Sequence, residues 1–198
     1  MIRRMLFASA TAALLVVPTG TFAAAASLQG TVTHAKESAD LVVYVVSAPG
    51  TFAAPKTDPV MNQKGMRFVP DVLPIVVGTT VEFLNGDAVV HNVFSPDGEG
   101  YNLGTWSKNA NRSYTFKHAG VYTQLCSIHP EMEAYIIVLQ NPYYAITNAA
   151  GHFKIDDLPP GHYELKVWGE HLKAKDTKRT FPVDVAAGGS TTTISLGS

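Results

Sequence analysis

Short runs of β-branched and aromatic residues recur along the chain, separated by Gly, Pro, Asn and Asp. Residues 162–168 (HYELKVW) alternate polar and apolar positions, a pattern typical of a half-buried strand. Further strands are expected at residues 28–33, 41–46, 113–116, 121–125, 134–139 and 152–155, on both sides of Gly78 within residues 76–83, and in a segment ending at Thr147. No stretch shows a long 3.6-residue period. The pattern therefore predicts an all-β fold of one or two β-sandwiches.

The N-terminal segment has a different pattern. Arg3 and Arg4 precede a mostly apolar run at residues 5–17, which Pro18 and Gly20 interrupt before four consecutive alanines at 23–26. A transmembrane anchor would need about 20 apolar residues, and this run has 13. The segment is thus expected to be an export signal spanning residues 1–26, cleaved near the alanines.

Composition agrees with a folded β protein and excludes one class of partner. Hydrophobic residues make up 46% of the 198 residues and charged residues 16%, with 16 Gly and 12 Pro for turns. Cleavage of the signal would remove two of the 15 basic residues and none of the 16 acidic ones, leaving a net charge of −3. Nucleic-acid binding needs a basic surface, so it is not expected.

The chain has a single cysteine, Cys126. Exported proteins normally pair their thiols, and this one has no internal partner. A lone thiol in an oxidising compartment is a buried bystander, a dimer contact or a ligand.

The residues near Cys126 in the sequence favour the third of these roles, a metal ligand. Cys126, His129 and Met132 form a C-x-x-H-x-x-M loop between two expected strands, and His91 lies upstream in the sequence H-N-V. One thiolate, two imidazoles and a weak axial thioether are the donor set of a blue-copper electron-transfer site. The spacing therefore predicts one copper ion held by His91, Cys126, His129 and Met132.

The surrounding sequence resembles the cupredoxin, or plastocyanin-like, family over about residues 57–140. The resemblance is carried by residues 68–70 (FVP), 73–85 (LPIVVGTTVEFLN), 91–93 (HNV) and 120–126 (GVYTQLC). The two-residue gaps of the loop are similar to the short amicyanin-type loop, and the arrangement resembles proteins described as methylamine-utilisation-like. The resemblance implies that Asn92 joins the two ligand loops by hydrogen bonding near the thiolate, and that His129 and Pro130 lie near the surface.

Other chemistries are weaker interpretations of the same residues. Structural zinc favours more Cys or His ligands and no thioether, and a Cys-His nucleophile lacks an orienting group and an oxyanion hole. Glu131 is an alternative oxygen ligand. Met61 and Met66 could form an accessory Cu(I) site, but we expect both side chains to pack in the core. Packing is also expected of Trp106, Tyr143 and Tyr144, and surface positions are expected of His34, His118, His152, His162 and His171.

The two ends of the chain resemble the beginning and end of a carboxypeptidase regulatory-like, transthyretin-type β-sandwich. The similar features are a G-x-V strand after Gly30, the V-V-Y-V-V run at 42–46, and L-P-P-G-H-Y-E-L at 158–165. We expect this sandwich to consist of residues 27–54 plus 141–198, with a Greek-key cupredoxin sandwich at 55–140 inserted in it or fused to it. The alternative is that residues 30–46 belong to the central domain.

The combined prediction is a periplasmic type 1 copper protein that carries single electrons between redox proteins of unknown identity. It is expected not to be an enzyme, and the mature protein is expected to have no membrane span. Two other functions use the same features: copper trafficking or storage with the same ligands, and an adhesion or assembly module in which copper is incidental.

Overall fold

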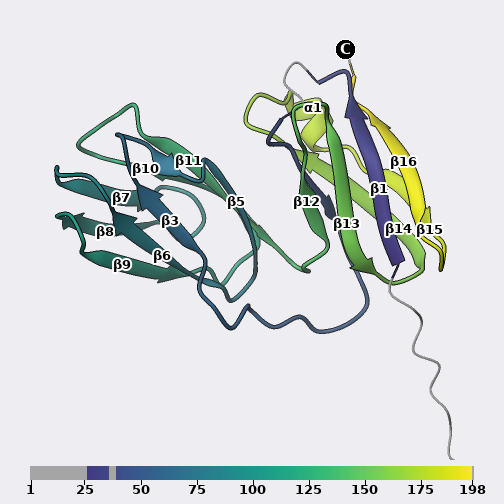
Figure 1. Cartoon of the computed structure of the whole chain (residues 1–198), viewed down its shortest axis with the longest axis horizontal. Coiled ribbons are helices and arrows are strands. Elements are labelled where there is room, and N and C mark those ends of the chain that lie inside the picture. Colours follow the sequence, from purple (N-terminus) through teal and green to yellow (C-terminus); the bar gives the residue numbers. More distant parts are fainter. Residues whose placement is uncertain (1–25, 36–38, 198) are drawn as a thin grey trace, which may run out of the picture.

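Two β-sandwiches lie beside each other in the computed structural model (Figure 1). The structure describes residues 26–35 and 39–197. The predicted export signal lies outside these residues except for Ala26, which is buried as the first residue of a strand. The one helix in the described part, α1 (Ala174–Thr177), has four residues, so no helix there has the length and apolarity of a membrane span. The predicted all-β fold is confirmed.

The first sandwich holds the central part of the chain. Its strands are β3 (Val60–Gln63), β4 (Phe68–Val69), β5 (Val72–Val76), β6 (Thr80–Asn85), β7 (His91–Ser95), β8 (Tyr101–Trp106), β9 (Asn111–Thr115), β10 (Gly120–Leu125) and β11 (Glu133–Leu139). One sheet has the order β4-β3-β6-β9 and the other β5-β11-β10-β7-β8. Every second residue of β6 points inward, and Val81 and Phe83 join Phe68, Phe116 and Ile136 in the core.

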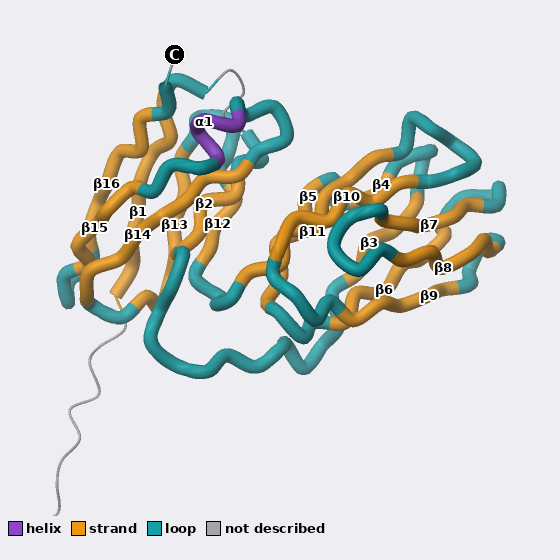
Figure 2. The backbone as a smooth tube through the Cα atoms, turned by 180° about the vertical axis from the view of Figure 1, so that it is seen from behind, coloured by secondary structure: helices purple, strands orange, loops and turns teal. Residues whose placement is uncertain are grey.

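The second sandwich combines both ends of the described chain. Its strands are β1 (Ala26–Thr33), β2 (Val42–Val45), β12 (Tyr144–Ile146), β13 (His152–Leu158), β14 (Gly161–Trp168), β15 (Phe181–Val185) and β16 (Ser190–Ser195). The sheet orders are β13-β1-β16 and β12-β2-β14-β15, so each N-terminal strand lies between C-terminal strands (Figure 2). Leu28, Ile155, Leu165 and Ile194 are fully buried between the two sheets.

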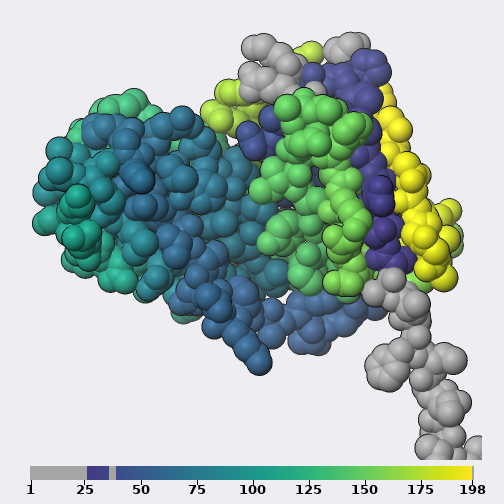
Figure 3. Space-filling view, in the orientation of Figure 1, coloured from purple at the N-terminus to yellow at the C-terminus, as the bar shows by residue number. Residues whose placement is uncertain are grey.

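The two sandwiches touch each other, as the space-filling view shows (Figure 3), and the side chains between them are mostly apolar. Val42 of β2 packs with Ile137 and Leu139 of β11, and the rings of Tyr135 and Trp168 lie 5.0 Å apart between centroids. The other face of β11 belongs to the core of the first sandwich. Because both faces of β11 are buried, its sequence is a nearly continuous apolar run.

Each strand expected from the sequence is present, with ends displaced by a few residues. The pattern missed β3, the two-residue β4, β8, β15 and β16. Polar residues or glycine interrupt β3, β8 and β16, and β15 contains a proline. In β3 the polar Gln63 is fully buried, and its Nε2 donates a hydrogen bond to the Leu84 carbonyl at 3.2 Å. Such strands are defined by their neighbours, so they lack a clear apolar alternation of their own.

Candidate metal centre

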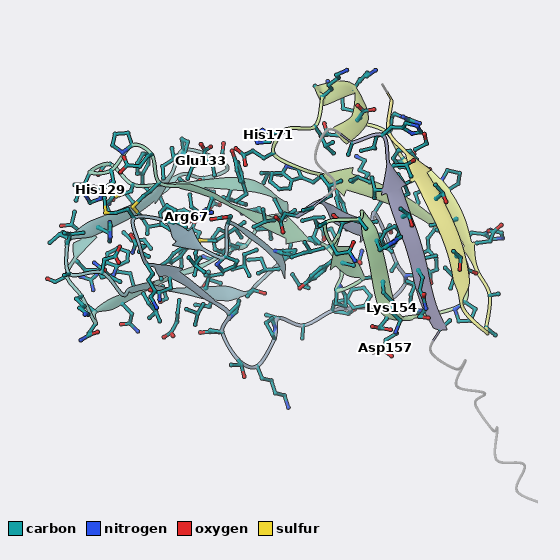
Figure 4. All side chains as sticks on the ribbon, turned by 45° about the horizontal axis from the view of Figure 1, so that its top comes forward. Arg67, His129, Glu133, Lys154, Asp157 and His171 are labelled. Atoms are coloured by element: carbon teal, nitrogen blue, oxygen red, sulfur yellow. The ribbon has the colours of Figure 1, made fainter. Side chains whose placement is uncertain are left out.

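The predicted ligands come from the start of one strand and from the loop that follows its antiparallel neighbour. His91 is the first residue of β7, and Cys126 directly follows β10. Leu125 of β10 pairs with Phe94 of β7, so β7 starts at the end of the sandwich where β10 stops. The loop from Cys126 to Met132 then leads into β11. His129 consequently lies at the end of the first sandwich far from the second one (Figure 4).

Three donor atoms converge at this end. The Nδ1 atoms of His91 and His129 lie 3.0 Å apart, and Cys126 Sγ lies 3.7 Å from His129 Nδ1. All three ligand atoms fall within 4.8 Å of one another, and among the described residues no other group of three or more His, Cys, Asp or Glu does so. His91 is fully buried, Cys126 is buried and His129 is half-buried. His91 and Cys126 are therefore shielded from solvent, and the cluster reaches the surface only at His129.

Met132, the fourth predicted ligand, lies on the same loop. Its backbone N–H donates to the His129 carbonyl at 3.0 Å, which closes a turn over residues 129–132, the second half of the C-x-x-H-x-x-M segment. Its side chain is 1% exposed and packs in the same apolar cluster as Cys126. Pro130 is exposed beside the half-buried His129, so the expected surface position of this edge is confirmed.

Asn92 connects the two ligand segments, as the resemblance implied. Its backbone N–H donates to Cys126 Sγ at 3.4 Å, and its side-chain Oδ1 accepts from the Ser127 N–H at 3.2 Å. The Asn92 Nδ2 donates to Asn102 Oδ1 at 2.9 Å and to the Gly104 carbonyl at 2.7 Å. This buried amide thus holds β7, β8 and the loop after β10 in one arrangement.

Asp87 also belongs to this site, although the sequence pattern alone did not single it out. Its Oδ2 lies 3.0 Å from His91 Nε2, on the side of the ring opposite the converging donors. Backbone N–H groups of Met66 and Gly65 also donate to this carboxylate, and these two bonds are the main reason that its pKa falls to about 2. The carboxylate precedes the histidine by four residues, a spacing that could have drawn attention to it.

The remaining candidate residues lie outside the cluster. Met61 is fully buried in the core of the first sandwich, as expected, and Met66 lies in the turn between β3 and β4. Glu131 is exposed and lines an open groove of about 290 Å³ with Met132, Glu133 and Glu170. His118 pairs with Glu99 on the surface at 2.8 Å. Trp106 is buried at the end of β8, and the histidines of the second sandwich are His34, His152, His162 and His171.

The donor chemistry fits copper. Two imidazole nitrogens and a thiol sulfur, with a buried thioether close by in the loop, match the ligand preferences of copper in its two common oxidation states. At 3.0 Å the two Nδ1 atoms can share a proton in a hydrogen bond, or both can bind one cation. The geometry is therefore compatible with a cation bound at this position.

Comparison with protein families agrees with this assignment for the central part of the chain. Residues 56–139 match the profile of copper binding proteins of the plastocyanin/azurin family. This segment is therefore a cupredoxin copper-binding domain. Residues 132–193 match a second profile, described as polysaccharide lyase family 4, domain II, which overlaps the first over residues 132–139, which include the whole of β11. The carboxypeptidase regulatory-like and methylamine-utilisation-like resemblances remain predictions.

Solved structures with similar sequence include several copper proteins. A copper-containing nitrite reductase from Thermus scotoductus SA-01 is 31% identical with a TM-score of 0.42, covering 48% of this chain and 25% of its own. A purple cupredoxin from Nitrosopumilus maritimus is 29% identical with a TM-score of 0.38, covering 41% of this chain and 99% of its own. An oxidised amicyanin variant is 29% identical with a TM-score of 0.39, covering 41% and 81%. No curated protein matches the sequence. Since these TM-scores are below 0.5, the assignment depends on the family profile.

Proposed function

We propose that the chain is a periplasmic single-electron carrier with one type 1 copper ion. His91, Cys126 and His129 would form the plane of ligands, and Met132 would be the weak axial contact. The observation that carries the proposal is the convergence of two Nδ1 atoms and one Sγ atom within 4.8 Å inside a cupredoxin domain. When bound, copper supplies a one-electron couple between Cu(I) and Cu(II).

The protein contributes rigidity and exclusion of water. His91 starts a strand, and Asn92 ties that strand to the segment carrying Cys126, so the donors are held before metal binds. Burial of His91 and Cys126 keeps water from these two ligands. A site that changes little between two oxidation states requires little reorganisation on electron transfer.

The surface near His129 supports transfer to another protein. The half-buried imidazole provides a short route from the ligand cluster to solvent. Three apolar side chains on the ligand-bearing loops are exposed by 44–45%: Val89, Val90 and Ile128. Exposed apolar side chains on the loops that carry a half-buried ligand suit a transient contact with a redox partner.

The decisive experiment is the visible spectrum of copper-loaded protein. We expect an intense band from charge transfer between the Cys126 thiolate and Cu(II). Cys126→Ser removes the sulfur, so it should abolish this band and weaken copper binding. A colourless protein that prefers zinc would contradict the proposal.

Two further measurements separate carrier from enzyme and from copper chaperone. A carrier keeps its copper through repeated cycles of oxidation and reduction in the presence of a competing chelator, whereas a trafficking protein releases it. We also expect no nitrite turnover by the loaded protein with a reduced dye as donor.

Periplasmic location follows from the proposed export signal. The N-terminal sequence of protein recovered from the periplasm should therefore begin near Ala26.

A further inference from the structure

Asp87 lies behind the most buried ligand of the metal centre. Its carboxylate accepts three hydrogen bonds: from the Gly65 N–H at 2.8 Å, from the Met66 N–H at 3.0 Å and from His91 Nε2 at 3.0 Å. The Asp87 side chain is 16% exposed and that of His91 is 0% exposed. Little water therefore competes for the contact between them.

The segment that carries Asp87 is itself held in place. The Asp87 N–H donates to Asn85 Oδ1 at 2.9 Å. The Nδ2 of Asn85 in turn donates to the carbonyls of Val89 and Trp106 at 2.8 and 2.9 Å. The carboxylate is thus fixed relative to both ends of the segment that leads to His91.

A strained turn faces the same carboxylate. Gly65 and Met66 both have positive φ, 66° and 60°, and the Lys64 N–H closes the turn on the Arg67 carbonyl at 2.9 Å. Methionine rarely adopts this left-handed conformation. The conformation aims two consecutive N–H groups at Asp87, so the turn and the carboxylate stabilise each other.

The contact determines which ring nitrogen of His91 can bind metal. An ionised carboxylate can only accept, so His91 Nε2 must carry a proton. In the neutral ring the lone pair is then on Nδ1, the atom that faces His129 Nδ1. The carboxylate also places a negative charge behind the ligand, which favours the more highly charged state of a bound ion.

From these contacts we propose that Asp87 is a positioning residue of the metal centre: it sets the tautomer of His91 and lowers the reduction potential of copper bound there. The inference rests on the proposed function. Asp87 joins His91 to the turn at Gly65 and Met66, so the proposed ligand is held from the sheet that contains β3 and β4 as well as from its own strand, β7.

The test compares Asp87→Asn with Glu99→Gln in the full copper-loaded chain. Both substitutions remove one carboxylate that contacts a histidine, but Glu99 contacts the exposed, non-ligand His118. Asparagine cannot accept from all three donors at once, because its Nδ2 is itself a donor. Asp87→Asn should raise the reduction potential and weaken Cu(II) binding by about 10- to 100-fold. Glu99→Gln should leave both at the wild-type values.

Equal behaviour of the two variants would overturn the inference. A second measurement needs no variant: nitrogen–proton NMR of the copper-free protein, in which no metal fixes the tautomer, should show the neutral ring of His91 protonated at Nε2 with slow solvent exchange. A proton on Nδ1, or fast exchange at Nε2, would also overturn it, and this measurement decides the matter if Asp87→Asn does not fold. A wild type with the charge-transfer band but no difference between the variants refutes the role of Asp87 alone. A wild type without the band refutes the proposed function and this inference with it.

Discussion

Asn92 and Asp87, two polar residues beside the proposed ligands, combine burial with hydrogen bonding of their side chains. Asn92 is 2% exposed, yet its side chain has partners on β8 and on the loop after β10, so its burial is compensated. Asp87 is satisfied by two backbone amides and one imidazole. Polar groups satisfied in this way hold side chains in one orientation, which a metal centre with little reorganisation requires.

Met132 provides a test at this scale. If its thioether is the weak axial donor, Met132→Leu should retain copper and raise the reduction potential, because loss of a donor disfavours Cu(II). Met61 is a matched control, since it is also a fully buried methionine of the same apolar cluster. Met61→Leu conserves volume and should leave the potential unchanged. An unchanged spectrum and potential in Met132→Leu, measured by redox titration, would show that Met132 is not a ligand.

At the scale of elements, strand order is determined by close packing between distant segments. β1 lies between β13 and β16, and its Gly30 sits beneath the ring of Phe153. A Cβ at position 30 would come 2.5 Å from Phe153 Cζ and 2.7 Å from the Thr192 carbonyl oxygen. A side chain larger than hydrogen therefore cannot fit at this crossing without displacing a neighbouring strand.

Gly30→Ala should accordingly lower the free energy of unfolding by about 1–3 kcal/mol, the usual cost of overpacking. Gly188→Ala is the control, because a Cβ there meets no atom within 4 Å. The copper spectrum of both variants should equal that of the wild type, since Gly30 and the proposed metal ligands belong to different sandwiches. Equal stability of the two variants in denaturant titration would show that β1 does not pack as described.

At the scale of the whole molecule, the first sandwich lies between two segments of the second one along the chain. The chain leaves β2 at Val45, forms the copper domain, and returns to β12 at Tyr144. The Asn141 Nδ2 donates to the Val45 carbonyl at 2.9 Å and joins the two crossing segments. We infer that residues 55–140 form a unit inserted into the sandwich made by residues 27–54 and 141–198.

A truncation tests this insertion. A chain ending at residue 140 loses the strands that pair with β1 and β2, so it should expose an apolar face and aggregate. Residues 55–140 alone should still show the copper charge-transfer band, because all four proposed ligands lie within them. Light scattering and visible spectra provide the readouts. A chain ending at residue 140 that was as soluble and stable as the full chain would place the N-terminal strands in the copper domain.

Features that depend on neighbouring residues can be predicted from the amino-acid sequence. The C-x-x-H-x-x-M spacing puts Cys126, His129 and Met132 in one loop, and the two-residue period identifies the strands with apolar alternation. Contacts between distant groups become known only from the folded chain: the carboxylate of Asp87 meets the turn at Gly65 and Met66, and β1 lies between β13 and β16. This difference arises because covalent geometry restricts positions within a turn, whereas contacts between segments far apart depend on how whole sheets pack.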